Sequence, residues 1–383
     1  MTPDALLEPA GVAVLALAER RLREGEPELR VATSLRTEYP ADLVAATMNQ
    51  VELRARARAK FSRAGEMLFT RAGLEQASSE DSASWRARRL STARDGPITD
   101  LCCGIGGDLL ALSAPERDVL GIDADPVHAA LARHNAQIYG GTPRVRVADA
   151  REVDVAGAAV FIDPARRSAG GRHRPGDYAP PLGWCLSLRD RAPLVAIKAA
   201  PGIEVASVPA GWEIEFVEVG GELKESVLWW PGGTKRRATM LPGGHSLAGD
   251  PAAWPPAEVR DPGPFLLDPS PAITRAGLVA HVAAAVNGWQ IDKRIAFLCA
   301  DEPGPTRFGR WYAVEASLPW HLKNLAAELR ARDVGAVDIR RRGLAGDVEH
   351  VRRSLRLSGR RRVLLAMTRR QDKPWALLAT PLS

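Results

Sequence analysis

The sequence predicts an α/β protein built on a mostly parallel, doubly wound sheet, with a helical module before it and a small α+β domain after it. Three observations support this fold class. Residues 97–240 alternate short apolar runs with helical patterns, residues 1–95 show mainly helical spacing, and a Pro- and Gly-rich stretch follows residue 240. Because 383 residues exceed the usual size of one core, we expect a division into 1–95, 96–242, a linker at 243–264, and 265–383.

The charge of the chain is unevenly placed. The formal net charge is +6, and the stretch from Arg340 to Arg370 contains 11 arginines against the two acids Asp347 and Glu349. This indicates a basic C-terminal surface, which is either a binding face for an anionic partner or a solvated face.

The cysteines and the apolar runs indicate in which cellular compartment the protein is found. The four cysteines, at 102, 103, 185 and 299, have neither zinc-ligand spacing nor the density of a secreted scaffold. The apolar run Ala10–Leu17 follows acidic residues, unlike a signal peptide, and no run reaches the ~20 apolar residues that span a membrane. We therefore expect a cytoplasmic protein without a membrane anchor or a metal site.

The first 95 residues contain two helical patterns and a basic run. Apolar residues recur at helical spacing near Val14 and again near Val44. Five basic residues lie between Arg54 and Arg63, and they form either a solvated helix face or a phosphate contact. We expect the segment Phe69–Gln76, with the polar stretch that follows it, to cover the site described next.

The stretch Pro97–Asp108 predicts a strand, a tight turn and a helix start. Gly104, Gly106 and Gly107 permit positive φ and close backbone approach, so a ligand can lie against the turn. Such a turn is shared by many nucleotide-binding α/β proteins and by plain structural turns. Its meaning therefore depends on the strands that follow.

Acidic residues follow the next three predicted strands. Asp123 ends the second strand, 23 residues after Asp100, near the offset at which an acid meets a ribose hydroxyl pair. Asp149 follows the third strand and either contacts an adenine amino group or is a solvent-facing turn residue. Asp163 ends the fourth strand, where Pro164 restricts the chain. Since ligands of open α/β sheets bind at the carboxyl edge, we expect these acids to line one site.

The remaining elements complete the sheet and the C-terminal domain. The polar loop 168–181 is expected to lie on the substrate side, and Leu194–Ala199 predicts a fifth strand. Residues 212–219 and 227–230 predict an antiparallel pair at the sheet edge. After residue 264 we expect two helices, near 276–286 and 322–331, and several strands ending with the pair 363–367 and 375–379.

These motifs, taken in order, resemble the class I S-adenosylmethionine-dependent methyltransferases. The matching stretches are Asp-Leu-Cys-Cys-Gly-Ile-Gly-Gly from Asp100, Gly-Ile-Asp-Ala-Asp, Ala-Asp-Ala and Asp-Pro-Ala-Arg. Residues 100–167 resemble the RNA-modifying branch that includes trimethylguanosine synthases, in the glycine turn and in Asn135–Gly140. With Phe69–Gln76 and the Arg-Arg-Gly343 region, the whole chain is similar to bacterial methyltransferases carrying a THUMP-like domain.

The resemblance implies S-adenosylmethionine as cofactor and RNA, tRNA or rRNA, as substrate. It implies that Asp100 and the glycine turn hold the methionine part, Asp123 the ribose and Asp149 the adenine. The expected cofactor-binding residues are Asp100, Cys102, Gly104, Gly106, Gly107, Asp123, Ala124, Asp149 and Ala150. The expected RNA-binding residues are Arg167, Arg340, Arg341, Arg342, Arg360 and Arg361.

The expected catalytic residues are Asp163, Pro164 and Arg166. Amino-methylating relatives carry Asp/Asn-Pro-Pro-aromatic here. Asp163 keeps the carboxylate that accepts a hydrogen bond from the target nitrogen, whereas Arg166 stands where the relatives have an aromatic ring that stacks on the base. Arg166 and Arg167 either engage a base or phosphate, as guanidinium groups can, or form a salt bridge to another acid. Uridine-C5 methyltransferases carry a nucleophilic cysteine after the fifth strand, where this chain has Lys198, so a cysteine-adduct mechanism is disfavoured.

Other functions remain open at this point. An NAD-dependent oxidoreductase could share the glycine turn and Asp123, but the usual Gly-x-Gly-x-x-Gly is absent. A non-catalytic RNA-binding adaptor, or a methyltransferase of a small molecule or a protein, would also fit the fold. The oligomeric state is not indicated by the sequence.

Overall fold

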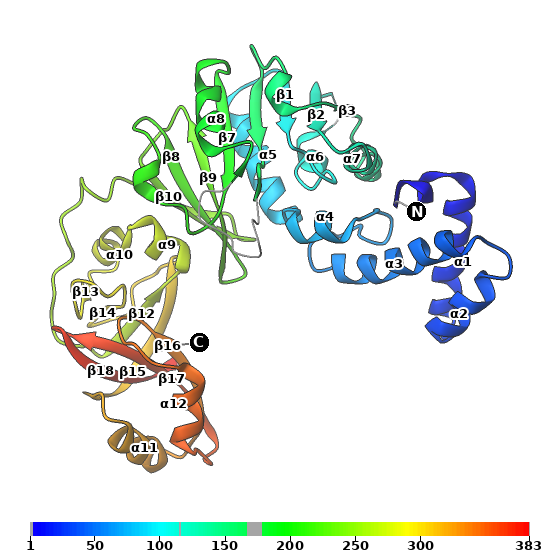
Figure 1. Ribbon diagram of the computed structural model, residues 1–383. Helices are drawn as coiled ribbons and strands as arrows, with labels where there is room; N and C mark the ends of the chain where they lie inside the picture. The colour runs from blue at the N-terminus through cyan, green and yellow to red at the C-terminus, as the bar shows by residue number, and fades with distance from the viewer. Residues whose placement is uncertain (1–2, 115, 167–177, 383) are drawn as a thin grey trace. The chain divides into compact units, whose positions relative to one another are not determined.

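The computed structural model describes residues 3–114, 116–166 and 178–382 (Figure 1). The chain divides into two compact units. Unit 1 consists of Met1–Trp212 with Glu225–Gly232, and unit 2 of Glu213–Lys224 with Gly233–Ser383. The four-part division expected from the sequence stays a prediction, and each unit is described by itself below.

Unit 1 begins with the expected helical module. Its helices are η1 (Pro3–Leu7), α1 (Pro9–Arg23), α2 (Glu28–Leu35), α3 (Ala41–Ala57), α4 (Arg71–Gln76) and α5 (Glu80–Ala93). Thr70 caps α4 by accepting from the Gly73 amide, and Ser79 caps α5 by accepting from the Ser82 amide. The side-chain oxygens of these caps satisfy amides that a helix start leaves without partners, which explains where both helices begin.

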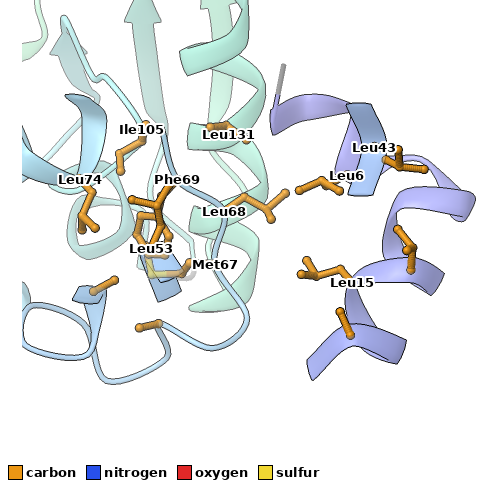
Figure 2. Packing of buried hydrophobic residues seen from close by; sticks show 14 of the residues in the cluster. Leu6, Leu15, Leu43, Leu53, Met67, Leu68, Phe69, Leu74, Ile105 and Leu131 are labelled. Carbon is orange, nitrogen blue, oxygen red and sulfur yellow. The ribbon is translucent and has the colours of Figure 1, made fainter. Parts of the chain in front are cut away.

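The helical module shares a hydrophobic core with the sheet domain that follows it. Figure 2 shows side chains of the module, among them Leu53, Met67 and Phe69, in one cluster with Ile105 and Leu131. Leu53, Met67 and Phe69 are completely buried. Because Ile105 belongs to the glycine turn, this packing ties the module to the loop expected to bind the cofactor.

The sheet of unit 1 confirms the expected mostly parallel arrangement. Its strand order is β9-β7-β4-β1-β2-β3, all parallel except β9, which runs antiparallel to β7. The strands are β1 (Ile98–Leu101), β2 (Val119–Asp123), β3 (Arg144–Val147), β4 (Ala159–Ile162), β7 (Leu194–Ala199) and β9 (Glu222–Trp230). β1, β4 and most of β7 are buried along their length, as apolar central strands of such sheets are.

Short helices connect these strands. They are α6 (Leu109–Leu112), α7 (Pro126–Ile138), α8 (Leu182–Ser187) and the turns η2 (Ala150–Glu152), η3 (Leu188–Asp190) and η4 (Val205–Ser207); β5 (Ala165–Arg166) pairs with β6 (Tyr178–Ala179). Asp125 caps α7, because its carboxylate accepts from the amides of Val127 and His128. Pro126 at the first position adds the φ that a helix needs.

Unit 2 contains strands from the sheet edge and the C-terminal α+β domain. β8 (Glu213–Val219) runs parallel to β10 (Arg236–Leu241), which is antiparallel to β11 (His245–Gly249), a strand inside the stretch 243–264. β8 connects to β9 through Gly220 and Gly221, whose φ values of 60° and 87° suit a two-residue hairpin turn. This connection agrees with the antiparallel pair expected from the sequence. The expected position at the sheet edge is wrong, because β10 and β11 lie beyond β8.

The rest of unit 2 forms a second sheet with the order β13-β14-β12-β15-β18-β17-β16. Its strands are β12 (Phe265–Pro269), β13 (Trp289–Gln290), β14 (Leu298–Ala300), β15 (Gly309–Pro319), β16 (Val334–Arg341), β17 (Arg361–Arg370) and β18 (Lys373–Pro381). The helices are α9 (Pro271–Ala276), α10 (Val279–Ala285), α11 (Leu322–Ala331) and α12 (Val348–Leu355). The small α+β domain expected after residue 264 is thus confirmed as a mixed sheet with helices.

Candidate active site

A buried carboxylate lies on the central strand of unit 1. Asp100 on β1 is fully buried, and neither of its carboxylate oxygens has a hydrogen-bond partner among the described residues. Burial, together with the charges of Asp108, Asp163 and Asp123, raises the pKa of this carboxyl well above its usual range. An orphaned buried acid of this kind suits a cationic ligand group, because such a group would supply both the missing donors and the missing charge.

The turn after β1 has a strained backbone and little room. Cys102 has a φ of 61°, a left-handed conformation that side-chain-bearing residues rarely adopt. At Gly106, φ is 88° and an added Cβ would lie 3.0 Å from the Ala132 Cα atom of α7. Gly104, with φ of 55°, has no atom within 4 Å of where a Cβ would lie. Gly106 is therefore required for packing on α7, whereas the side of Gly104 is open to a ligand.

Asp123 at the end of β2 joins the turn to the start of α7. Its carboxylate accepts from the backbone amides of Gly104, at 2.8 Å, and Asp125, at 2.9 Å. A His128 ring nitrogen lies 3.9 Å from the same carboxylate, and the other ring nitrogen lies 3.3 Å from the Thr70 hydroxyl. The acid expected to bind a ribose is therefore held in place by the glycine turn, and Ala124 beside it is exposed.

Asp149 has a partner of its own. The Arg151 guanidinium lies 2.5 Å from the Asp149 carboxylate, and the Arg151 amide also donates to it. These hydrogen bonds lower the pKa of Asp149 to about 2. Asp149 is thus ionised at neutral pH and caps η2, while the neighbouring Ala150 is buried. Its expected contact with an adenine amino group stays a prediction.

Asp163 at the end of β4 lies against a lysine that the sequence analysis did not select. The Lys198 Nζ atom of β7 is 2.7 Å from Asp163 Oδ2 and 3.4 Å from the carbonyl oxygen of Gln76. Burial alone would lower the pKa of Lys198, but the carboxylates of Asp163, Glu225 and Asp108 outweigh it and the pKa is raised. Lys198 is therefore a buried cation, and Pro164 beside Asp163 is also buried.

A second buried cation lies in the same region. The Arg86 side chain of α5, 1% exposed, forms ion pairs with Asp108, at 2.5 Å, and with Glu225. It also lies over the Phe161 ring of β4, 5.3 Å from the ring centroid. Burial raises the pKa of Glu225, although Arg86 and Lys198 oppose this effect. The region therefore contains more buried carboxyl groups than cations, which favours a ligand with positive charge.

The segment between α4 and α5 covers the glycine turn. An added Cβ at Gly107 would lie 3.2 Å from the Ala77 Cβ and 3.3 Å from the Ser78 amide nitrogen. At Gly73, an added Cβ would lie 2.5 Å from the Ile105 side chain. With the contact of Gln76 to Lys198, this agrees with the expectation that the helical module covers the site.

The cysteines of unit 1 are poor nucleophiles. Burial and nearby carboxylates raise the pKa of Cys102 and of Cys103, and burial raises the pKa of Cys185 to about 12. Since the thiolate is the reactive form, these thiols are unreactive near neutral pH. This agrees with the sequence-based argument against a cysteine adduct.

One expected catalytic side chain and one expected RNA-binding residue are not described by the structure. The side chain of Arg166 and all of Arg167 lie outside the described residues, as does most of the loop 168–181. The backbone of Arg166 pairs with Tyr178. Their expected contacts with a base or phosphate stay predictions.

The five C-terminal arginines lie in unit 2, in or beside β16 and β17, and all have partners. Arg340 and Arg342 approach Asp268, at 3.7 and 2.8 Å. Arg341 donates to the Gly346 carbonyl, Arg360 pairs with Asp333, and Arg361 pairs with Glu315. Arg342 is turned inward, since it also donates to Thr274 and to the Pro269 carbonyl, whereas the Arg360 side chain is 93% exposed. Of the two, Arg360 is the more accessible to an anion.

Sequence reasoning missed Lys198, Arg86, Asp108 and Glu225 as members of the site. The available signals were weak: a single lysine at the carboxyl end of an apolar strand, and an arginine among several others in a helical segment. Both cations find their partners through contacts between residues far apart in the chain.

The described residues contain no sign of two other kinds of site. In the described ranges, none of the helices is long and apolar enough to cross a membrane. Among these same residues, no three His, Cys, Asp or Glu side chains are grouped so that they could hold a metal ion.

Comparison with family models gives three matches. Residues 96–157 match a family described as RNA cap guanine-N2 methyltransferase, and residues 309–381 match a THUMP domain-like family. Residues 2–57 match a domain of unknown function. The first two matches fall on the turn-and-strand region and on the C-terminal sheet.

Comparison with whole proteins extends the likeness to most of the chain. Two Mycobacterium tuberculosis proteins, of strains CDC 1551 and H37Rv, are each 38% identical over 312 residues, covering 79% of this chain and 85% of theirs. Both are described as uncharacterized S-adenosylmethionine-dependent methyltransferases. A crystal structure of a Porphyromonas gingivalis W83 protein, described as a candidate methyltransferase, has a TM-score of 0.79 at 20% identity, covering 97% of this chain and 98% of that one. The last likeness shows that the two chains share a fold.

Proposed function

Because this chain belongs to the family of S-adenosylmethionine-dependent methyltransferases that includes the two Mycobacterium tuberculosis proteins, we propose that it methylates a nitrogen atom of an RNA base. The observation that carries the proposal is the placement of Asp100 and Asp163 at the carboxyl ends of the paired strands β1 and β4. One acid is buried without a partner, and the other has one oxygen, Oδ1, without a hydrogen-bond partner among the described residues. Asp100 can therefore bind a cationic group of the cofactor, and Asp163 can accept a hydrogen bond from an N–H group of the substrate.

The residues at this edge fit the cofactor. The two orphaned oxygens of Asp100 suit the ammonium group of the methionine part, and the open side of Gly104 leaves room beside it. Asp123, held by two backbone amides, keeps lone pairs that can accept from ribose hydroxyls. Asp149 would contact the adenine only while it also keeps its bonds to Arg151.

Asp163 is assigned to the binding of the methyl-accepting nitrogen. When bound, the cofactor supplies a methyl group activated on a sulfonium sulfur. Asp163 Oδ1 accepts a hydrogen bond from an N–H of the substrate base and thereby directs the nitrogen lone pair toward the methyl group. A C–N bond then forms as the C–S bond breaks, with the electron pair of that bond left on sulfur. The displaced N–H proton passes to the Asp163 carboxylate and then to water. No residue of this scheme needs to form a covalent adduct.

RNA is proposed as the substrate on the basis of two domains. The family match at 96–157 is described as RNA cap guanine-N2 methyltransferase. The match at 309–381 is described as THUMP domain-like, and it covers β15–β18 with the arginines of β16 and β17. Exposed side chains such as Arg360 suit phosphate oxygens. A small molecule or a protein would not require this basic surface.

The test is transfer of a labelled methyl group to RNA. Bulk tRNA and rRNA are prepared from cells with and without the gene and incubated with the purified protein and labelled S-adenosylmethionine. Label in RNA from the deletion strain, and much less in RNA from the parent strain, is the expected result. Asp163→Ala should abolish the label, whereas the protein should still bind S-adenosylmethionine in calorimetry. Label found only in protein or small-molecule fractions of the deletion strain would assign the substrate to those classes instead.

A further inference from the structure

The buried lysine beside Asp163 has a role that can be argued from its surroundings. We propose that Lys198 is a positioning residue for methyl transfer, which holds Asp163 in the orientation that leaves Oδ1 free for the acceptor N–H. The inference rests on the proposed role of Asp163 as acceptor of that N–H. It concerns how the carboxylate is held, whichever substrate class carries the N–H group.

The geometry comes from two neighbouring parallel strands. Ile162 of β4 and Ile197 of β7 are register partners, so Asp163 and Lys198 follow at the next position on the carboxyl edge. The Nζ atom lies 2.7 Å from Asp163 Oδ2, a close ion pair, and the Lys198 side chain is only 11% exposed. A charged hydrogen bond in such a protected place is stronger and better oriented than one in water.

The charges around Lys198 determine whether its amine is neutral, as a general base requires, or charged, as a positioning group requires. To accept a proton, a lysine must first be neutral, and burial without acidic neighbours would favour that form. Here the carboxylates of Asp163, Glu225 and Asp108 keep the ammonium charged. Lys198 therefore has no free lone pair for a proton, and its three N–H groups can only donate.

Donation to Oδ2 has a defined consequence for Asp163. The carboxylate stands near Asp100, Asp108 and Glu225, so without Lys198 the only described buried cation left in this group would be Arg86. Arg86 is already bound to Asp108 and Glu225. Lys198 thus balances the charge of Asp163 and prevents the carboxylate from rotating, which keeps Oδ1 directed to one place.

A purely structural role is the alternative, because Lys198 also contacts the Gln76 carbonyl at the end of α4. The chain offers a matched control for this role. The Lys60 Nζ atom donates to the carbonyls of Leu74, Glu75 and Ala77, at 2.7, 3.1 and 2.9 Å. Lys60 therefore anchors the same end of α4 through lysine donation, and none of these three acceptor atoms belongs to Asp163.

The first measurement is steady-state methyl transfer by Lys198→Met, Lys198→Arg and Lys60→Met. We expect Lys198→Met to lower kcat by about 100-fold without weakening the binding of S-adenosylmethionine by more than about threefold. Lys198→Arg, which keeps the charge, should recover at least about tenfold of that loss. Lys60→Met should lose thermal stability but keep kcat within about threefold at a temperature where it is folded. A Lys198→Met enzyme with the wild-type kcat would overturn the proposal.

The second measurement needs no methyl acceptor. Sinefungin carries a primary amine in place of the methyl-bearing sulfonium, so its ammonium probes the charge at the transfer position. Removing Lys198 leaves Asp163 uncompensated, and Lys198→Met should favour sinefungin over S-adenosylhomocysteine by about tenfold more than the wild type does. Lys60→Met should show the wild-type ratio of the two affinities. The double variant Lys198→Met/Asp163→Asn should also show it, because the uncompensated charge of Asp163 is then gone.

The two measurements separate the two proposals. If the wild-type protein transfers no label to RNA, the RNA proposal fails, and the ligand ratio still decides whether the Lys198–Asp163 pair borders the transfer position. If Lys198→Met does not fold, methyl transfer by Lys198→Arg and the ligand ratio of the single variant Asp163→Asn can still be measured. Asp163→Asn leaves the Lys198 ammonium without its partner. This variant should therefore bind sinefungin more weakly, relative to S-adenosylhomocysteine, than the wild type does. An unchanged ratio in Lys198→Met, or in Asp163→Asn where Lys198→Met does not fold, would contradict the assignment of Lys198.

Discussion

Arg86 of α5 and Glu225 of β9 are 139 residues apart in the chain and form an ion pair in the interior of unit 1, with side chains 1% and 5% exposed. The same guanidinium binds Asp108, directly after the glycine turn. One arginine of the helical module thus joins the segment after the glycine turn to the antiparallel strand of the sheet. This arrangement and its neighbours lead to the following predictions.

Arg86→Met should destabilise the protein severely. The substitution leaves Asp108 and Glu225 buried without a cation, and breaking a buried pair from one side costs about 3–5 kcal/mol. The free energy of unfolding, measured with urea, tests this. Arg88→Met is the control, because Arg88 is an exposed neighbour on the same helix and its loss should change stability by less than about 0.5 kcal/mol. Equal effects of both variants would show that the buried network adds nothing.

Asp100 should make cofactor binding depend on pH. Its raised pKa means that the free protein holds the carboxyl protonated below that pKa, whereas an ammonium ligand needs the carboxylate. The affinity for S-adenosylmethionine should therefore rise as pH rises through the raised pKa. Calorimetry from about pH 5 to about pH 9 measures this. In Asp100→Asn the affinity should be weaker and this rise should be missing; a variant with the same pH dependence as the wild type would remove Asp100 from the cofactor site.

The same substitution should make the protein more stable at neutral pH. A group whose pKa is raised on folding contributes stability below its unfolded pKa and loses it as pH rises through the folded pKa. Asp100→Asn removes that loss, so its free energy of unfolding should exceed that of the wild type at neutral pH, by at least about 1 kcal/mol. The difference should disappear at a pH below the unfolded pKa of an aspartate. Thermal or urea unfolding at both pH values provides the comparison.

Asn135→Leu should affect both stability and cofactor binding. The Asn135 amide group binds the backbone N–H and carbonyl of Leu68 and the carbonyl of Ile105, each at 2.9 Å, so it connects the helical module to the glycine turn. Leaving these buried groups unsatisfied should cost about 2–4 kcal/mol and loosen the turn. Urea unfolding and calorimetry with S-adenosylmethionine measure the two effects. Gln137→Leu, at an exposed position of the same helix, should change neither.

Arg342 and Arg360 should respond differently to substitution. Arg342→Ala removes bonds to Asp268, Thr274 and Pro269 and should destabilise unit 2 by about 1–3 kcal/mol. Arg360→Ala should leave stability unchanged and, if RNA binds here, reduce the slope of log affinity against log salt by about 1. Titration with bulk tRNA at several salt concentrations tests this. An unchanged slope in Arg360→Ala would place the RNA elsewhere.

Much of the fold was predictable because its signals are local. The glycine turn after β1, the acids after β2, β3 and β4, and the Asp125–Pro126 cap of α7 each depend on a few neighbouring residues. The period of apolar residues likewise indicated which segments are helices and which are strands. Some elements were missed, since short elements in Pro- and Gly-rich or strongly charged stretches give weak periodic patterns. They are α9, α12 and the strands β5, β6 and β10–β13.

The site was only partly predictable. Asp163 was selected because a parallel sheet brings the carboxyl ends of its strands to one edge, and Asp100 because of the family resemblance. That Asp149 pairs with Arg151, and that Arg342 turns inward to Asp268, depends on side-chain conformations that no spacing rule gives.

The sequence by itself determined the order of strands, turns and helices from β1 to β4 and the acids at the strand ends, because these follow from residues that are neighbours in the chain. Only the tertiary structure decided that Lys198 binds Asp163, that Arg86 joins Asp108 to Glu225, and that Asp100 is left without a partner. Ion pairs and buried acids of this kind arise from the strand order and from close packing of distant segments, and their energies depend on how completely water is excluded.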